Sequence, residues 1–190
     1  MLTDPILLDL QKKFKTKEYW GGKDNYFIDL LENIIGQQLS IKVAKVIFGR
    51  FIALFDTPTP SAEEILAIPN ETYRAQGLSN AKAQYVKNIA QAVIDNELQT
   101  ENFDQMTDEQ IKDQLVKIKG IGNWTAEMFL IFSMKRPDVF SLGDLGLRTA
   151  IEKLYGIKRD NLKKIEKLSK TWSPYRTLAS RLLWSSLDNI

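Results

Sequence analysis

The 190-residue chain contains neither cysteine nor histidine. Without cysteine it has no disulfide, no thiolate ligand for zinc or an iron–sulfur cluster, and no thiol nucleophile. Without histidine it has no Ser-His-Asp triad, no imidazole ligand for a metal and no imidazole general base. Any acid–base chemistry therefore falls to carboxylates, lysines or tyrosines.

Long apolar segments are missing as well. No apolar run approaches the roughly 18 residues that a membrane span requires. The N-terminal segment MLTDPILLDLQKKF carries acids before its basic cluster, unlike a secretory signal. A hydrophobic content of 44% and a charged content of 26% are typical of globular proteins. We therefore expect an intracellular, soluble protein of the cytoplasm or nucleoid, with no membrane partner. Its length suits one domain or two lobes that share an active cleft.

The net charge of +2 conceals an asymmetry along the chain. Residues 112–181 hold fifteen Lys and Arg against seven Asp and Glu, a net charge of +8, and the remaining residues carry −6. A concentration of positive charge is the electrostatic footprint expected for binding a polyanion. Solvated lysine-rich helices would give the same count, so charge alone leaves both interpretations open.

Apolar residues recur at intervals of three and four along most of the chain, the pattern of amphipathic helices. The clearest stripe covers residues 26–35, and Gly36 ends it. A second helix is expected over residues 40–55 with Ser40 as its N-cap, and Asp144 begins another. Strand-like alternation is not evident, so the sequence predicts an all-α protein.

The segment LVKIKGIGNWTA, Leu115 to Ala126, interrupts one helix and starts the next. Glycines 120 and 122 allow a tight turn with positive φ and a close backbone approach to another molecule. The unsatisfied N–H groups of the restarting helix favour an anion such as phosphate. Lys117 and Lys119 lie on the approach, where they supplement those amides. The backbone carbonyls of Val116, Ile118 and Ile121 are placed to hold a monovalent cation that bridges to the phosphate.

Gly-Ile-Gly alone is a weak motif, because many turns between helices use glycine. Three further segments strengthen it, in matching order and spacing: IIGQQLSIKVA (34–44), DVFSLGDLGLR (138–148) and WSPYRTLASRLLW (172–184). With them the chain resembles the helix-hairpin-helix DNA glycosylase superfamily over residues 25–187. Within that superfamily it most resembles the alkylation-repair branch, DNA-3-methyladenine glycosylase II.

This resemblance implies an all-α, two-lobed fold with the active cleft between the lobes. One lobe is expected over residues 28–136, a helical barrel that includes the hairpin (112–133). The other is expected to combine residues 1–27 and 137–190. Larger family members carry an extra N-terminal β-rich domain, for which 190 residues leave no room.

Asp144 matches the catalytic aspartate of the family. A carboxylate at a helix N-terminus is held ionised by the helix dipole and by backbone N–H groups. It can stabilise the positive charge that builds on deoxyribose as an N-glycosidic bond breaks, and it can orient or deprotonate the attacking water. The alternative is an aspartate that only caps its helix.

Trp124 stands where bifunctional relatives of the endonuclease III type carry a lysine nucleophile. Tryptophan cannot form a Schiff base, so the resemblance implies base removal by water that leaves an intact abasic site. Alkylated purines often carry a delocalised positive charge, which an electron-rich indole face binds. A tryptophan buried in the core is the alternative for this position.

The resemblance assigns roles to four further side chains. Trp184 matches a second pocket tryptophan, with core packing as its alternative. Met128, one turn after Trp124, stands where relatives often have tyrosine and gives the base pocket a softer, apolar wall. Gln38 lies in a loop that fills the gap left by the everted nucleotide. Ser40 either reaches a phosphate or caps its helix.

Together these features predict a monomeric, monofunctional glycosylase that excises 3-methyladenine-type purines from double-stranded DNA and requires no cofactor. One alternative is a glycosylase for an oxidised or deaminated purine. The other is a non-catalytic module that binds DNA through the hairpin. Such a module would gain nothing from Asp144, because an acid facing DNA repels phosphates.

Overall fold

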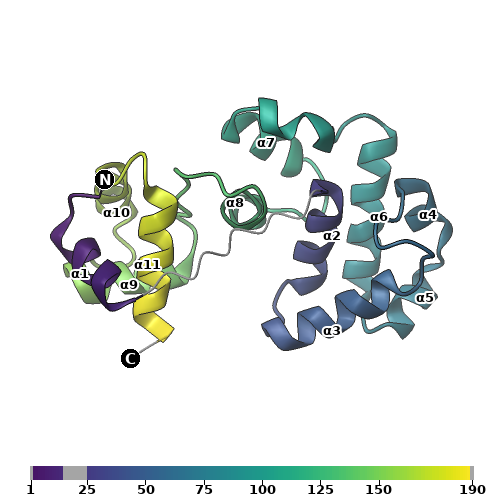
Figure 1. Cartoon of the computed structure of the whole chain (residues 1–190), viewed down its shortest axis with the longest axis horizontal. Helices are drawn as coiled ribbons and strands as arrows, with labels where there is room; N and C mark the ends of the chain where they lie inside the picture. Colours follow the sequence, from purple (N-terminus) through teal and green to yellow (C-terminus); the bar gives the residue numbers. More distant parts are fainter. Residues whose placement is uncertain (1, 15–24, 189–190) are drawn as a thin grey trace. The chain divides into compact units, whose positions relative to one another are not determined.

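The computed structural model describes residues 2–14 and 25–188. Every regular element in those ranges is helical, which confirms the predicted all-α class (Figure 1). None of these helices is both long enough and apolar enough to cross a bilayer. In chain order the elements are α1 (Pro5–Lys13), α2 (Tyr26–Gly36), α3 (Ile41–Ile52), α4 (Ala62–Ala67), α5 (Asn70–Ala75), α6 (Asn80–Ile94), the 3-10 helix η1 (Thr100–Gln105), α7 (Asp108–Leu115), α8 (Asn123–Met128), the π-helix η2 (Phe129–Ser133), α9 (Leu145–Tyr155), α10 (Leu162–Lys170) and α11 (Arg176–Asp188).

The described residues divide into two compact units. Residues 25–129 form one unit, and residues 2–14 with 130–188 form the other. The lobe boundaries given by the sequence stay a prediction.

The unit of residues 25–129 is built around α6. Helices α2, α4 and α5 pack against α6, α3 packs against α2, and α7 packs against α8. The predicted stripe of α2 is buried, because its apolar residues return to one face every three or four positions. The largest fully buried side chains of this unit are Leu30, Leu31, Ile34, Ile35, Phe51, Ile65, Tyr73, Ile89, Phe103 and Phe129.

The second unit has its core between α9 and α11, with α1 packed against α11 (Figure 1). Its buried residues include Leu7, Leu147, Ile151, Ile165, Trp172, Leu182 and Leu183. Helix α9 runs through this core, so its N-terminus, where Asp144 lies, is held by the packing of the whole unit.

Asp4 ties the beginning of the chain to that core. Its Oδ1 caps α1 by accepting the Ile6 and Leu7 N–H groups at 2.9 and 3.1 Å. The same carboxylate accepts the Tyr155 hydroxyl at 3.0 Å and the Trp172 indole Nε1–H at 3.1 Å. Burial and the hydrogen bond to Asp4 raise the pKa of Tyr155 well above its ordinary value, so the phenol stays a donor.

Asp4→Ala should therefore lower the free energy of unfolding by roughly 2–4 kcal/mol, because it removes a helix cap and leaves two partly or fully buried donors unsatisfied. Asp9→Ala on the same helix is the control. Asp9 forms an exposed ion pair with Lys13, and its loss should stay within about 0.5 kcal/mol. Urea unfolding curves measure both, and equal losses would show that the Asp4 contacts do not stabilise the unit.

Candidate active site

Asp144 is the N-cap of α9, with extended backbone angles of φ −71° and ψ 121°. Its Oδ1 accepts the Leu147 backbone N–H at 2.8 Å and the Trp184 indole Nε1–H at 3.0 Å. The first contact is an ordinary helix cap, and it lies beside the positive end of the helix dipole. The second comes from 40 residues further along the chain, and a cap does not require it. The carboxylate is therefore held by both the backbone and a side chain.

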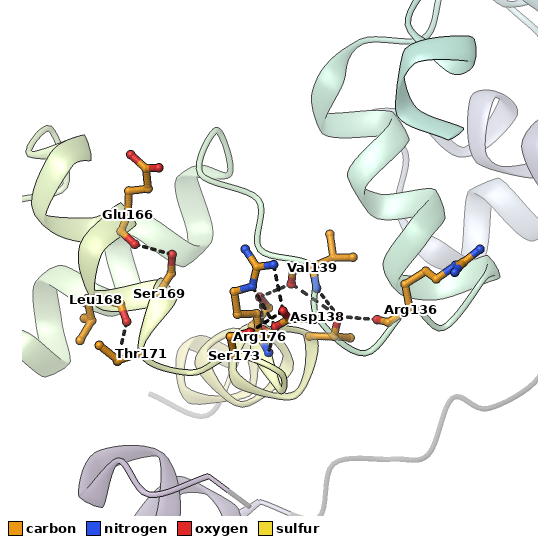
Figure 2. A network of polar contacts seen from close by, with 11 residues as sticks. Arg136, Asp138, Val139, Glu166, Leu168, Ser169, Thr171, Ser173 and Arg176 are labelled. Carbon is orange, nitrogen blue, oxygen red and sulfur yellow. Dashed lines mark hydrogen bonds and ion pairs between the residues drawn. The ribbon is translucent and has the colours of Figure 1, made fainter. Parts of the chain in front are cut away.

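The loop that leads to Asp144 is fastened to the start of α11. Arg176 pairs with Asp138 through two hydrogen bonds, Nε to Oδ1 at 2.8 Å and Nη2 to Oδ2 at 3.0 Å (Figure 2). Thr177 Oγ1 accepts the Val139 N–H at 3.0 Å and donates to the Arg136 carbonyl at 2.6 Å. These contacts fix residues 136–139 against the helix that carries Trp184.

The Asp138 carboxyl is charged within this network. Burial alone would raise its pKa, but hydrogen bonds from Arg176 and Ser173 outweigh burial and hold the pKa below its ordinary value. Arg176 thus has a structural role, as a bidentate partner of a carboxylate.

Trp184 packs at the edge of the core and stacks on Phe132, with ring centroids 5.7 Å apart and planes inclined by 26°. Phe132 lies in η2 and is 42% exposed. Sequence patterns did not indicate Phe132, because a π-helical turn shifts the residues that follow out of the 3.6-residue phase on which helical patterns depend. Phe132 is thus an apolar side chain that stays exposed beside Trp184, for which a pocket role is predicted.

The Gly-Ile-Gly turn joins α7 to α8 as predicted, and its steric demand falls on Gly120. Gly120 has φ of 115°, and a Cβ added there would lie 2.4 Å from Cγ of Tyr85. Gly122 has φ of −95° and open space where a Cβ would point. Only Gly120 therefore needs to be glycine for the turn itself.

Buried and exposed side chains alternate around this turn. Ile118 and Ile121 are buried, whereas Lys117 and Lys119 are exposed. The isoleucines anchor the turn, and the lysines are left to solvent or to a charged ligand. Such an arrangement suits the predicted contact with a phosphate, although that contact stays a prediction.

The predicted cation ligands are backbone carbonyls of the same turn. The Ile118 carbonyl accepts the Ile121 N–H at 3.0 Å, and Val116 is 37% exposed. A carbonyl has two lone pairs, so this hydrogen bond leaves Ile118 able to contact a cation. Within the described ranges no group of three or more acidic, histidine or cysteine side chains is placed to hold a metal ion.

Gln38 lies in the loop between α2 and α3 and is exposed. Its φ of 59° is in the left-handed region, which is uncommon for a residue with a side chain. Backbone strain of this kind collects at functional sites, so it agrees with the predicted wedge role without testing it. Ser40 caps α3 by accepting the Val43 N–H at 3.4 Å, the structural alternative that the sequence left open.

Gln37 joins this loop to the hairpin, a contact that the sequence did not indicate. Its side-chain Nε2–H donates to the Gly120 carbonyl at 3.3 Å and to Thr125 Oγ1 at 3.0 Å. The backbone carbonyl of Gln37 accepts a hydrogen bond from Lys82 Nζ at 2.6 Å, and the same ammonium donates to the Ile35 backbone carbonyl at 2.9 Å. The two segments predicted to contact DNA thus belong to one hydrogen-bonded assembly.

Trp124 is the second residue of α8 and is 46% exposed, so it is not a tryptophan buried in the core. Met128, four residues later in the same helix, is 7% exposed. The exposed indole of Trp124 has a face available to stack against a ligand, whereas the nearly buried Met128 has only a small part of its side chain available for contact. The base-pocket role of both residues stays a prediction.

Comparison with known proteins agrees with these features. The sequence profile described as HhH-GPD superfamily base excision DNA repair protein matches residues 31–174. The chain is 36% identical over 169 residues to DNA-3-methyladenine glycosylase 1 of Schizosaccharomyces pombe, covering 86% of this chain and 73% of that protein.

Two solved structures are similar over nearly the whole chain. The DNA-3-methyladenine glycosidase of Bacillus halodurans has a TM-score of 0.80 and 30% identity, covering 98% of this chain and 91% of that one. The S. pombe 3-methyladenine DNA glycosylase Mag1, in complex with abasic DNA, has a TM-score of 0.80 and 32% identity, covering 98% and 93%. These similarities confirm the helix-hairpin-helix glycosylase fold.

The different surroundings of Gly120 and Gly122 allow a direct test of the geometry of the hairpin turn. Gly120→Ala should lower the free energy of unfolding by about 2 kcal/mol or more, because it combines an unfavourable φ with overlap on the Tyr85 ring. Gly122→Ala should change it by less than about 1 kcal/mol, since this N-cap position has room for a methyl group. Chemical denaturation of both variants measures the difference, and similar values would contradict the geometry of the turn.

Proposed function

The chain belongs to the HhH-GPD superfamily of base excision DNA repair proteins, and from that premise we propose that it is a monofunctional glycosylase for alkylated purines. It is a DNA glycosylase for alkylated bases, like the relatives that bear that name. The finer proposal is that it hydrolyses the glycosidic bond of 3-methyladenine-type purines in double-stranded DNA and leaves an intact abasic site. We further propose that it acts as a monomer in the cytoplasm or nucleoid.

The observation that carries the proposal is the held carboxylate of Asp144. Two N–H donors converge on its Oδ1, at 2.8 and 3.0 Å, at the N-terminus of α9. Fixed charge of this kind stabilises an opposite charge that develops during a reaction, because the site needs no reorganisation when that charge appears. A glycosidic bond that breaks ahead of nucleophilic attack places positive charge on the sugar.

The proposed reaction is a hydrolysis in two stages. The bond between deoxyribose C1′ and the purine nitrogen breaks, and the base leaves with the electron pair, which neutralises the positive charge that alkylation placed on it. The sugar cation is stabilised by the Asp144 carboxylate. The oxygen of water then bonds to C1′, and Asp144 accepts the proton that this water loses before passing it to solvent. An alkylated base is already a good leaving group, so little general-acid help is required.

Trp124 supports both the substrate class and the absence of lyase chemistry. An exposed indole face binds a delocalised cation in preference to a neutral base. An indole nitrogen cannot act as the amine nucleophile that a Schiff-base mechanism requires. Met128 and Trp184 are proposed as further walls of the base pocket.

DNA binding is assigned to the hairpin and the α2–α3 loop. The N–H groups at Gly120 and Gly122, with Lys117 and Lys119, are proposed to bind one phosphate. A monovalent cation on the carbonyls of residues 116, 118 and 121 would bridge to that phosphate while DNA is bound. The α2–α3 loop contributes Gln38 as the wedge in the duplex and Ser40 as a contact to the backbone, beside its role as a cap.

Asp144→Asn should abolish base release and retain DNA binding, because the amide keeps the size of the side chain but removes its charge. Free methylated purines released from alkylated DNA measure the first effect, and binding to duplex DNA with an abasic-site analogue measures the second. Asp160→Asn, at an exposed loop position, is the control and should retain both. Base release by Asp144→Asn at the wild-type rate would contradict the mechanism.

Trp124→Ala should slow release of a cationic alkylated base by roughly tenfold or more, the size of a lost cation–π contact in a desolvated site. Affinity for undamaged DNA should change by no more than about twofold, because non-specific binding depends on phosphate contacts. Single-turnover rates and binding curves measure the two quantities. Equal losses in rate and affinity would identify Trp124 as a general DNA contact and not a base-binding residue.

A further inference from the structure

We propose that Trp184 is a positioning residue for Asp144: its indole N–H fixes the orientation of the carboxylate that stabilises the sugar cation. This inference rests on the proposed glycosylase function and extends it. It assigns to the indole nitrogen a task that differs from forming a wall of the base pocket, for which only the aromatic ring is needed.

A helix cap alone does not fix a carboxylate. The terminal torsion of an aspartate is broad and roughly two-fold, so a helix cap by itself constrains the plane of a carboxylate less than two donors do. The indole Nε1–H of Trp184 reaches the same Oδ1 from a different helix, α11, at 3.0 Å. Two donors from different directions define the carboxylate plane, and with it the direction from which Asp144 faces the sugar.

Trp184 is itself held from two sides. Its ring stacks on Phe132, and α11 is fastened near its start by the Asp138–Arg176 ion pair. Gly146 allows the indole to come close to α9: a Cβ there would lie 3.1 Å from Asp144 Oδ1 and 3.3 Å from Trp184 Nε1. A glycine in the first turn of a helix lowers helix stability, so its presence is consistent with a need for close approach.

Orientation matters to the rate because electrostatic stabilisation depends on charges that are already in place. A carboxylate that turns away from the sugar must be brought back in the transition state, and that reorganisation adds to the barrier. Loss of the indole donor should therefore slow the chemical step and leave DNA binding intact.

Trp184→Phe tests the nitrogen apart from the ring, since phenylalanine keeps an aromatic surface for Phe132 and for a base. The matched control is Trp172→Phe. Trp172 also donates its indole N–H to an aspartate in the same unit, but its partner is Asp4, at 3.1 Å, which caps α1 and has a structural role. Each variant loses one indole-to-carboxylate hydrogen bond.

At saturating protein on methylated DNA, Trp184→Phe should release base about tenfold more slowly or worse, the effect of one lost hydrogen bond to a charged group. Its affinity for DNA should match that of the wild type. Trp172→Phe should be less stable yet release base at the wild-type rate when it is folded. Equal rates for the wild type and Trp184→Phe would overturn the inference.

If Trp184→Phe does not fold, Gly146→Ala tests whether the indole of Trp184 positions Asp144. The methyl group would press on both Asp144 Oδ1 and the indole edge, so their hydrogen bond must shift by a few tenths of an ångström and base release should slow in a protein that stays folded. Gly143→Ala, where nothing lies within 4 Å of the added Cβ, should be silent. A wild-type rate in Gly146→Ala would overturn the inference.

A spectroscopic signature separates this inference from the function on which it rests. The indole N–H resonance of Trp184 should shift in Asp144→Asn, while that of Trp172 should not. An unshifted Trp184 resonance would overturn the hydrogen bond whatever the activity. A wild-type protein that releases no methylated base would overturn the proposed function, whereas an active wild type matched by Trp184→Phe overturns only the positioning role.

Discussion

The hydrogen bonds that converge on Asp144 Oδ1 are the constraint on which the proposed chemistry of this chain depends. One donor is the backbone N–H of Leu147 and the other is the indole of Trp184. Packing of α9 against α11 brings the two together, and the Asp138–Arg176 pair keeps the preceding loop in register with α11.

The elements proposed to grip DNA show the same reliance on backbone geometry. Gly120 and Gln38 both have positive φ, and Gln37 connects their loops by hydrogen bonds to the Gly120 carbonyl and Thr125. A hairpin that binds a phosphate and a loop that enters the duplex must keep a fixed separation to act on one nucleotide. Gln37 and Lys82 supply that connection inside the unit. The position of the hairpin on DNA would therefore determine the position of the α2–α3 loop.

Local sequence patterns predicted a large share of this structure. The stripe of α2, the Gly-Ile-Gly break and Asp144 at a helix start are each encoded by a short stretch of neighbouring residues, where periodicity and capping rules apply. The contacts of Gln37 with the hairpin and of Trp184 with Asp144 join residues 83 and 40 positions apart, and no local rule indicates them. Phe132 was not predicted for a different reason: it lies in the π-helix η2, where the 3.6-residue periodicity used to assign helix faces does not hold.

The central claim is that water, directed by Asp144, releases the base without a covalent enzyme intermediate. The most direct measurement incubates the protein with alkylated duplex DNA and follows free base, strand integrity and borohydride-trapped complex in one experiment. The account predicts free 3-methyladenine, strands that break only after alkali, and no trapped complex. Strand cleavage without alkali, or a protein–DNA adduct that borohydride makes permanent, would contradict it.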